Sequence, residues 1–165
     1  MIRTKQTFTR PGNATTYAAG DAVCNSDGDY ITFFDGEQIE SGSVIAGKLS
    51  ISNGSTTNAS FELFLFRDYN NIPSLTDNSA FAMTAAAEED LIGYMAFTLI
   101  TTGSSGSAVA WDSNVDTIIP FKRKVGSDGT RYGLYGVLTA TAAYDPVSEL
   151  TDVDVTLYVD DGHTS

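Results

Sequence analysis

Hydrophobic and polar residues alternate along much of this chain in short runs, which is the pattern of β-strands with one buried face. The run near the end is the clearest, because residues 153–159 read VDVTLYV, with an aliphatic residue at every second position. Clusters of Gly, Asn, Asp and Ser separate the runs and are typical of turns. We predict strands over residues 4–10, 30–34, 44–52, 61–67, 93–100, 108–112, 117–122, 132–144 and 153–159.

Two of these segments are apolar or small on both faces. Residues 61–67 read FELFLFR, so Phe64 and Phe66 make the second face largely apolar as well. Such a strand is central or sandwiched, or its outer face meets a partner. Residues 132–144 (YGLYGVLTATAAY) form the best candidate for a core strand, in which Gly133 and Gly136 allow a bulge or a close contact between sheets.

One segment, residues 78–90, is predicted to contain a helix. Thr84 suits the N-cap position, and the alanines at 85–87 have high helix propensity. The acidic residues 88–90 follow late in the segment, where the helix dipole disfavours negative charge. We therefore expect a short helix.

Many short strands and one helix exclude a βαβ architecture. The fold class we predict is all-β: an antiparallel two-layer β-sandwich, jelly-roll-like, with one short helix and an extended N-terminal arm. The 165 residues suffice for one domain. Pro11-Gly12-Asn13 breaks the chain after the first strand, so we expect the arm over 1–12 and a single β-sandwich domain over 13–165. The opening lacks the apolar region, about 7–15 residues long, of a secretory signal.

The charge balance narrows the choice of partners. Nine Lys and Arg face 21 Asp and Glu, a formal charge of −12, which disfavours nucleic acid and anionic membrane surfaces. No apolar run approaches the ~18 residues of a membrane helix, so we expect a soluble chain. The first ten residues are purely basic, whereas no Lys or Arg follows Arg131. The basic start and the acidic end pair within one subunit or between neighbours, or remain solvated surface charge.

The residues that catalysis needs are scarce. His163 is the only histidine and lies in a polar tail, and we find no spacing that fits a nucleophilic, phosphate-binding or dinucleotide-binding motif. Cys24 is the single cysteine, and we interpret it as a small buried hydrophobic residue. We therefore predict a non-enzymatic protein without a cofactor.

Carboxylates are the remaining source of chemistry. Asp21, Asp27 and Asp29 offer oxygen ligands for Ca²⁺, but Asx-Gly turns have the same sequence pattern, and we favour turns over a metal site. The pair Asp160-Asp161 is interpreted in the same way. Residues 88–90 (EED) are neighbours on a helix and do not face a common substrate, as a glycosidase pair would.

Other side chains suggest contacts with partners. Lys122-Arg123-Lys124 is the sole basic cluster and is either a solubilising strand end or an electrostatic contact with a neighbouring subunit. Trp111 is either a sugar-stacking residue or an anchor in a core or interface. The candidate residues for contact with a partner protein or another subunit are Arg3, Lys5, Phe8, Arg10, Lys122, Arg123 and Lys124.

Several motifs carry a resemblance to a known group. They are the opening pattern F-T-R-P-x-x-T-x-Y-x-x-G-D, carried with one extra residue over 8–21, then LFLF at 63–66, DNSAF at 77–81 and YDPVS at 144–148. In these motifs the chain resembles small virion proteins of tailed bacteriophages, some of which are similar to head decoration or cement proteins. The resemblance covers most of the chain.

The resemblance implies a structural protein that binds and stabilises the capsid exterior and is located on the outer surface of the virion. Its implied partners are the major capsid protein and itself, as a homotrimer, with the arm lying along a capsid-protein edge by strand addition. The alternative is a carbohydrate-binding β-sandwich module of a phage tail or fibre, which would use Trp111 and Tyr69. A hydrolase is a third, more remote hypothesis.

Overall fold

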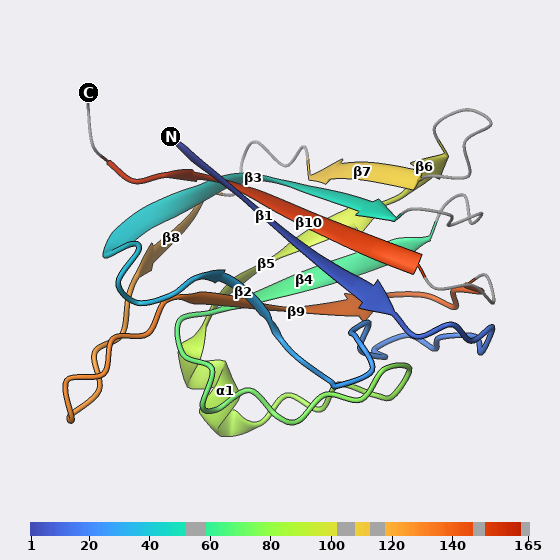
Figure 1. Cartoon of the computed structure of the whole chain (residues 1–165), viewed down its shortest axis with the longest axis horizontal. Coiled ribbons are helices and arrows are strands. Elements are labelled where there is room, and N and C mark those ends of the chain that lie inside the picture. Colours follow the sequence, from blue (N-terminus) through green and yellow to red (C-terminus); the bar gives the residue numbers. More distant parts are fainter. Residues whose placement is uncertain (52–58, 102–107, 113–117, 147–150, 163–165) are drawn as a thin grey trace.

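The computed structural model describes residues 1–51, 59–101, 108–112, 118–146 and 151–162, with Thr101 and residues 108–112 described in their backbone alone. Two antiparallel sheets face each other (Figure 1). The first has six strands, in which β8 pairs with β3 beside the path β1-β10-β3-β7-β6. Its strands are β1 (Ile2–Arg10), β3 (Ser41–Ile51), β6 (Ile100–Thr101), β7 (Ala108–Asp112), β8 (Ile119–Lys122) and β10 (Thr151–Asp160). The second, in the order β2-β9-β4-β5, consists of β2 (Ile31–Phe34), β4 (Ser60–Phe66), β5 (Leu91–Thr98) and β9 (Leu134–Ala140).

The strand order identifies the topology as a jelly roll. When the short strands β6 and β8 are left out, the eight remaining strands can be counted from one to eight along the chain. One sheet then has the spatial order first, eighth, third and sixth. The other contains the second, seventh, fourth and fifth. This interleaving is that of two Greek keys folded over each other, the arrangement of a double-sheet jelly roll. The predicted fold class is confirmed.

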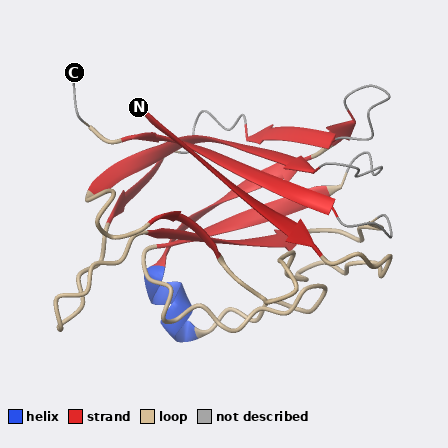
Figure 2. Ribbon diagram, viewed as in Figure 1, coloured by secondary structure: helices blue, strands red, loops and turns tan. Residues whose placement is uncertain are grey.

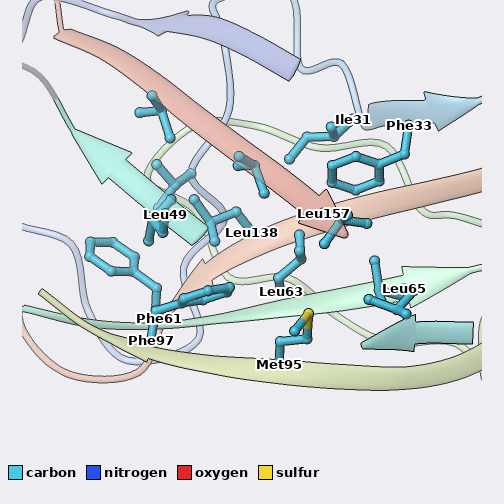
Figure 3. Packing of buried hydrophobic residues seen from close by; sticks show 14 of the residues in the cluster. Ile31, Phe33, Leu49, Phe61, Leu63, Leu65, Met95, Phe97, Leu138 and Leu157 are labelled. Carbon is cyan, nitrogen blue, oxygen red and sulfur yellow. The ribbon is translucent and has the colours of Figure 1, made fainter. Parts of the chain in front are cut away.

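The core lies between the two sheets (Figure 3). Leu49 and Leu157 come from the six-stranded sheet, and Leu63, Phe97 and Leu138 face them from the four-stranded one. All five are at most 1% exposed. The alternation of residues 153–159 arises because β10 turns its aliphatic residues into this layer and its polar residues outward.

A second apolar layer covers the outer face of the four-stranded sheet. Helix α1 (Ala85–Asp90) and the long segment before it lie against this face (Figure 2). Phe66 and Tyr135 are buried there, and Phe64 is half-buried. The two-faced pattern of residues 61–67 therefore has a simple cause: β4 is central, between β9 and β5, and the chain itself covers most of its outer side.

The helix begins and ends as predicted. The Oγ1 atom of Thr84 accepts a hydrogen bond of 3.2 Å from the backbone N–H of Ala87, which caps the first turn. Six residues follow before the chain enters β5 at Leu91.

Most predicted strands differ from the observed ones by one to three residues at their ends, and two differ in more than that. Segment 93–100 is divided, because Leu99 donates its backbone N–H to Ala59 and the chain then crosses into the other sheet at Ile100. Segment 132–144 keeps only Leu134–Ala140 as strand β9, which lies in the core as predicted and is buried on both faces.

The expected N-terminal arm is an edge strand rather than a free extension. All nine residues of β1 pair with β10, from Ile2 opposite Val159 to Arg10 opposite Thr151. The strand therefore belongs to the same sheet as the C-terminal part of the chain. Whether residues 13–165 form a domain without it stays a prediction.

Candidate interaction surface

The outer face of β1 and β10 brings the basic start and the acidic end of the chain together. Arg3, Lys5, Thr7 and Thr9 alternate on this face of β1 and are exposed. Lys5 forms an ion pair of 2.7 Å with Asp154, and the N-terminal amine lies 3.8 Å from Asp161. Of the alternatives open for the two ends, these contacts are those of pairing within one subunit, and not the solvated surface charge that the sequence favoured.

Two threonines hold acidic side chains of β10 on the side of β1. The hydroxyl of Thr7 donates to Asp154 at 2.5 Å, and that of Thr9 donates to Asp152 at 2.7 Å. Partial burial alone would raise the pKa of Asp154, but hydrogen bonds from Lys5 and Thr7 and the nearby charges outweigh it and lower the pKa. Asp154 is therefore held ionised on this face.

Cations from two strands flank β10. The register places Lys5 of β1 and Lys48 of β3 on either side of Thr156. Together with Arg3 they line a small polar hollow of about 80 Å³ that Asp154 also borders. We call Arg3, Lys5 and Lys48 the basic face. The sequence analysis missed Lys48 because only the strand register brings it beside the N-terminal strand.

Arg10 differs from the other candidate contact residues because it is only 1% exposed. Its guanidinium carbon lies 5.8 Å from the ring centre of Tyr17, and its Nη1 donates to the carbonyl of Asn13 at 3.0 Å. The side chain thus ties the end of β1 to the following loop. Because the Arg10 side chain is buried, a partner cannot reach its charge, and Arg10 is not part of the proposed contact surface.

Tyr17 joins three of the motifs that carry the phage resemblance. Its hydroxyl donates to Asp77 of the DNSAF motif, and its ring lies 5.5 Å from that of Tyr144 of the YDPVS motif. The backbone N–H groups of Tyr17 and Tyr144 also bond each other's carbonyls. Phe61, which precedes the LFLF motif, packs edge-on against Tyr144. Motifs far apart in sequence therefore form one buried cluster, whose role is structural.

The basic cluster at 122–124 does not act as one patch. Lys122 is exposed on β8, whereas Arg123 donates to the carbonyl of Gly36 at 2.9 Å. Lys124 forms ion pairs of 2.8 and 2.9 Å with Asp68 and Asp90, whose side chains are 4% and 2% exposed. Of the three, Lys122 alone is left on the surface for an outside partner.

The Lys124 contact belongs to a charge network whose carboxylates are buried and whose cations are partly exposed. Arg67 also pairs with Asp90, at 3.2 Å. Burial favours a higher pKa for Asp90, but its bonds to Lys124, Asn71 and Arg67 outweigh burial and lower the pKa. Hydrogen bonds to Asp68 and Asp90 raise the pKa of Lys124. The network fixes α1 and the segment after β4 to the connection between β8 and β9.

Phe8 is half-buried on the inner face of β1 and packs against the core. The Phe8 side chain is therefore only partly accessible at the surface of the sandwich.

No candidate for catalysis emerges in the part of the chain that the structure describes. Cys24 is buried, as predicted, and burial and the nearby Asp77 raise its pKa to about 12. The carboxylates of Asp21 and Asp29 accept hydrogen bonds within their own loops, from Ala18 and Asn25. His163 lies outside the described residues. The described residues contain no group of three or more side chains suited to a metal.

The two aromatic residues considered for sugar binding are Tyr69 and Trp111. Tyr69 stacks on Tyr30 at 5.5 Å and packs edge-on against Tyr132 and Tyr135. Tyr69 remains 36% exposed. Trp111 lies in β7 opposite Lys48, and its side chain is outside the described residues.

An apolar hollow on the outer face of the four-stranded sheet was not predicted. It has a volume of about 340 Å³ and is lined by Phe64, Phe81, Met83 and Leu91, with Glu62 and Glu88 also contributing. Tyr94 beside it is 56% exposed. The apolar second face of segment 61–67 indicated that this side of the strand is covered or meets a partner. The sequence did not show how much of this face other parts of the chain cover.

Comparisons with known proteins found solved structures of low similarity only. No family model and no curated protein sequence matches the chain. A crystal structure of a decameric BFDV capsid protein is similar with a TM-score of 0.36 and 17% identity, over 96% of each chain. The structure of Cocksfoot mottle virus gives a TM-score of 0.29 and 9% identity, over 94% of this chain and 95% of that one. These TM-scores are too low to carry an argument about function. Within the described residues, no helix is long and apolar enough to span a membrane.

Proposed function

We propose that this chain is a non-enzymatic structural protein of a phage particle that binds and stabilises the outside of the capsid as a cement or decoration protein. The observation that carries the proposal is the basic face. Arg3, Lys5 and Lys48 gather on one sheet of a protein whose formal charge is −12. A partner with an acidic patch would be attracted there, while the rest of the acidic surface limits unspecific binding.

The resemblance to small phage virion proteins supports the choice of partner. Its motifs meet in the cluster around Tyr17 and Asp77, so they describe a shared way of building the molecule. Jelly rolls form many viral capsid domains, although fold alone does not determine function. The proposed partner is the major capsid protein.

The mechanism needs no chemical step. Each subunit contributes a modest binding energy at many symmetry-related sites of a shell, and the sum opposes expansion or rupture of the particle. A rigid sandwich suits this role, because little conformational entropy is lost when it binds.

Co-sedimentation with expanded, decoration-free capsids tests the proposal. The wild-type chain should bind to saturation, and Lys48→Glu should weaken binding about tenfold, or about 1.4 kcal/mol. Arg131→Glu is the matched control, because it reverses an exposed cation that is not part of the basic face and forms a 2.9 Å ion pair with Glu37. Absence of wild-type binding would contradict the capsid role. Equal binding by the two variants would contradict the use of the basic face.

A further inference from the structure

The sandwich is open along one side, between β1 and β2. Each is the last strand of its sheet on that side. Among the described contacts, the hydroxyl of Thr4 donates to the carbonyl of Phe33 at 3.0 Å and spans the gap. Hollows of about 540 and 190 Å³ lie along the remainder, bordered by residues of both strands. Ile2 and Phe8 face the core here but are only partly buried.

The free edge of β1 is long and regular. Nine residues pair with β10 without a shift in register, and the strand contains no proline. On the side away from β10, no described strand pairs with the backbone of β1. Such an edge is a template for another strand unless charge or a bulge protects it.

The charges along β1 are divided between its two halves. On its outer face, Arg3 and Lys5 occupy the first half and the neutral Thr7 and Thr9 the second half, while Arg10 at the end of the strand is buried. Those threonines hold the carboxylates of Asp154 and Asp152 beside the second half. The strand thus has a basic half and an acid-flanked half, an arrangement that complements itself when reversed.

Only one register of self-pairing satisfies the chemistry. Inward residues must face inward residues, which restricts an antiparallel pair of β1 strands to every second register. Pairing centred on Gln6 matches all nine residues, sets Arg3 opposite Thr9 and sets Lys5 opposite Thr7. Centring on Lys5 would place two lysines opposite each other, a destabilising arrangement. Centring on Thr7 would leave Arg3 without a partner in the strand.

We propose that β1 pairs antiparallel with β1 of a second copy of this chain, with a two-fold axis at Gln6. In this arrangement Lys5 of each copy approaches Asp154 of the other, and Arg3 approaches Asp152. The two six-stranded sheets become continuous, and the neighbouring subunit covers the open side near Ile2 and Phe8. The interface is formed between two copies of this chain through the backbone edge of β1, so the inference does not rest on the capsid role. It gives dimers rather than the homotrimer implied by the resemblance.

Disulfide trapping in the absence of capsids tests this pairing, in a Cys24→Ala background. Gln6→Cys would place two cysteines opposite each other, with Cα atoms about 4.5–5.5 Å apart, within the range that disulfides span. Thr9→Cys is the matched control, because the two copies of residue 9 would be six residues out of register, roughly 20 Å apart. We expect a cross-linked dimer from Gln6→Cys alone, although Thr9 is the more exposed position. Equal cross-linking of the two variants, or none, would overturn the proposal.

Sedimentation equilibrium over a concentration series gives an independent reading. The wild-type chain should approach twice the mass of one chain, and Thr7→Lys should shift the equilibrium toward monomer at least tenfold, because it sets a second cation opposite Lys5. Lys122→Glu, on an exposed residue of β8, should leave it unchanged. Circular dichroism confirms that each variant is folded. A wild-type chain that stays monomeric, or forms trimers, contradicts the two-fold pairing.

Discussion

Tyr17 donates its hydroxyl hydrogen to the carboxylate of Asp77, with distances of 2.7 and 2.8 Å to the two oxygens. The backbone N–H of Cys24 donates to the same carboxylate at 3.1 Å. Burial raises the pKa of both Tyr17 and Asp77. This contact joins the loop after β1 to the segment that leads to the helix, which an antiparallel bridge between Asp21 and Ala80 also connects.

Removing the Tyr17 hydroxyl should destabilise the protein. Tyr17→Phe removes one of the hydrogen-bond donors to the partly buried carboxylate of Asp77. We expect a loss of about 1–3 kcal/mol in the free energy of unfolding. Urea denaturation measures it. Tyr94→Phe is the control, since that side chain is 56% exposed and its substitution should cost less than about 0.5 kcal/mol. Similar losses for the two variants would contradict a structural role for the Tyr17–Asp77 bond.

Lys124 should stabilise the fold over a defined pH range. Lys124→Met leaves Asp68 and Asp90 without their shared cation, and we expect a loss of about 2 kcal/mol near pH 7, reduced from a fully buried pair because Lys124 is partly exposed. The lowered pKa of Asp90 adds stability above the ordinary value of 3.8, which is lost as the pH falls through the folded value. The raised pKa of Lys124 adds stability below 10.5, which is lost as the pH rises through the folded value.

The difference between wild type and Lys124→Met should therefore be largest between these two pH values and shrink outside them. Thermal unfolding at a series of pH values measures this difference. Lys122→Met, on a neighbouring exposed lysine, should show little change at any pH. A Lys124→Met deficit that is constant into strong acid would show that the loss comes from packing and not from charge.

Two glycines at the start of β9 should differ in their tolerance of alanine. A methyl group on Gly133 would lie 1.9 Å from the carbonyl oxygen of Phe34, which is backbone and cannot move freely. One on Gly136 would lie 2.8 Å from the Phe33 ring and 3.0 Å from the end of Leu63, which can shift. We expect Gly133→Ala to cost about 3 kcal/mol or more and Gly136→Ala about 1–2 kcal/mol, measured by urea denaturation. The reverse order would contradict the close approach at Gly133.

The strands were largely predictable because their faces differ so strongly in polarity. Residues 153–159 alternate cleanly, since β10 lies between two strands with one face in the core and one in water. The helix was predictable from Thr84 and three alanines, because capping is a local interaction. The boundary at Ile100 was not, because the crossing from one sheet to the other depends on a bond between Leu99 and Ala59, forty residues apart in sequence.

The candidate contact residues were harder to predict, because exposure depends on the tertiary structure. Arg10 and Arg3 look alike in the sequence, yet Arg10 ends β1 over the ring of Tyr17 and is buried. Lys124 likewise looks like its neighbour Lys122, but Asp68 and Asp90 draw it toward the interior. Lys48, in contrast, joins the basic face only through the register of β3 with β10.

The location of the chain on an intact particle tests the central claim most directly. A cryo-electron microscopy reconstruction of the virions that contain this protein should show a jelly-roll density on the outer surface of the capsid. The outer face of β1, β10 and β3 should be turned toward the major capsid protein. Density for this fold only in the tail or fibre would contradict the account.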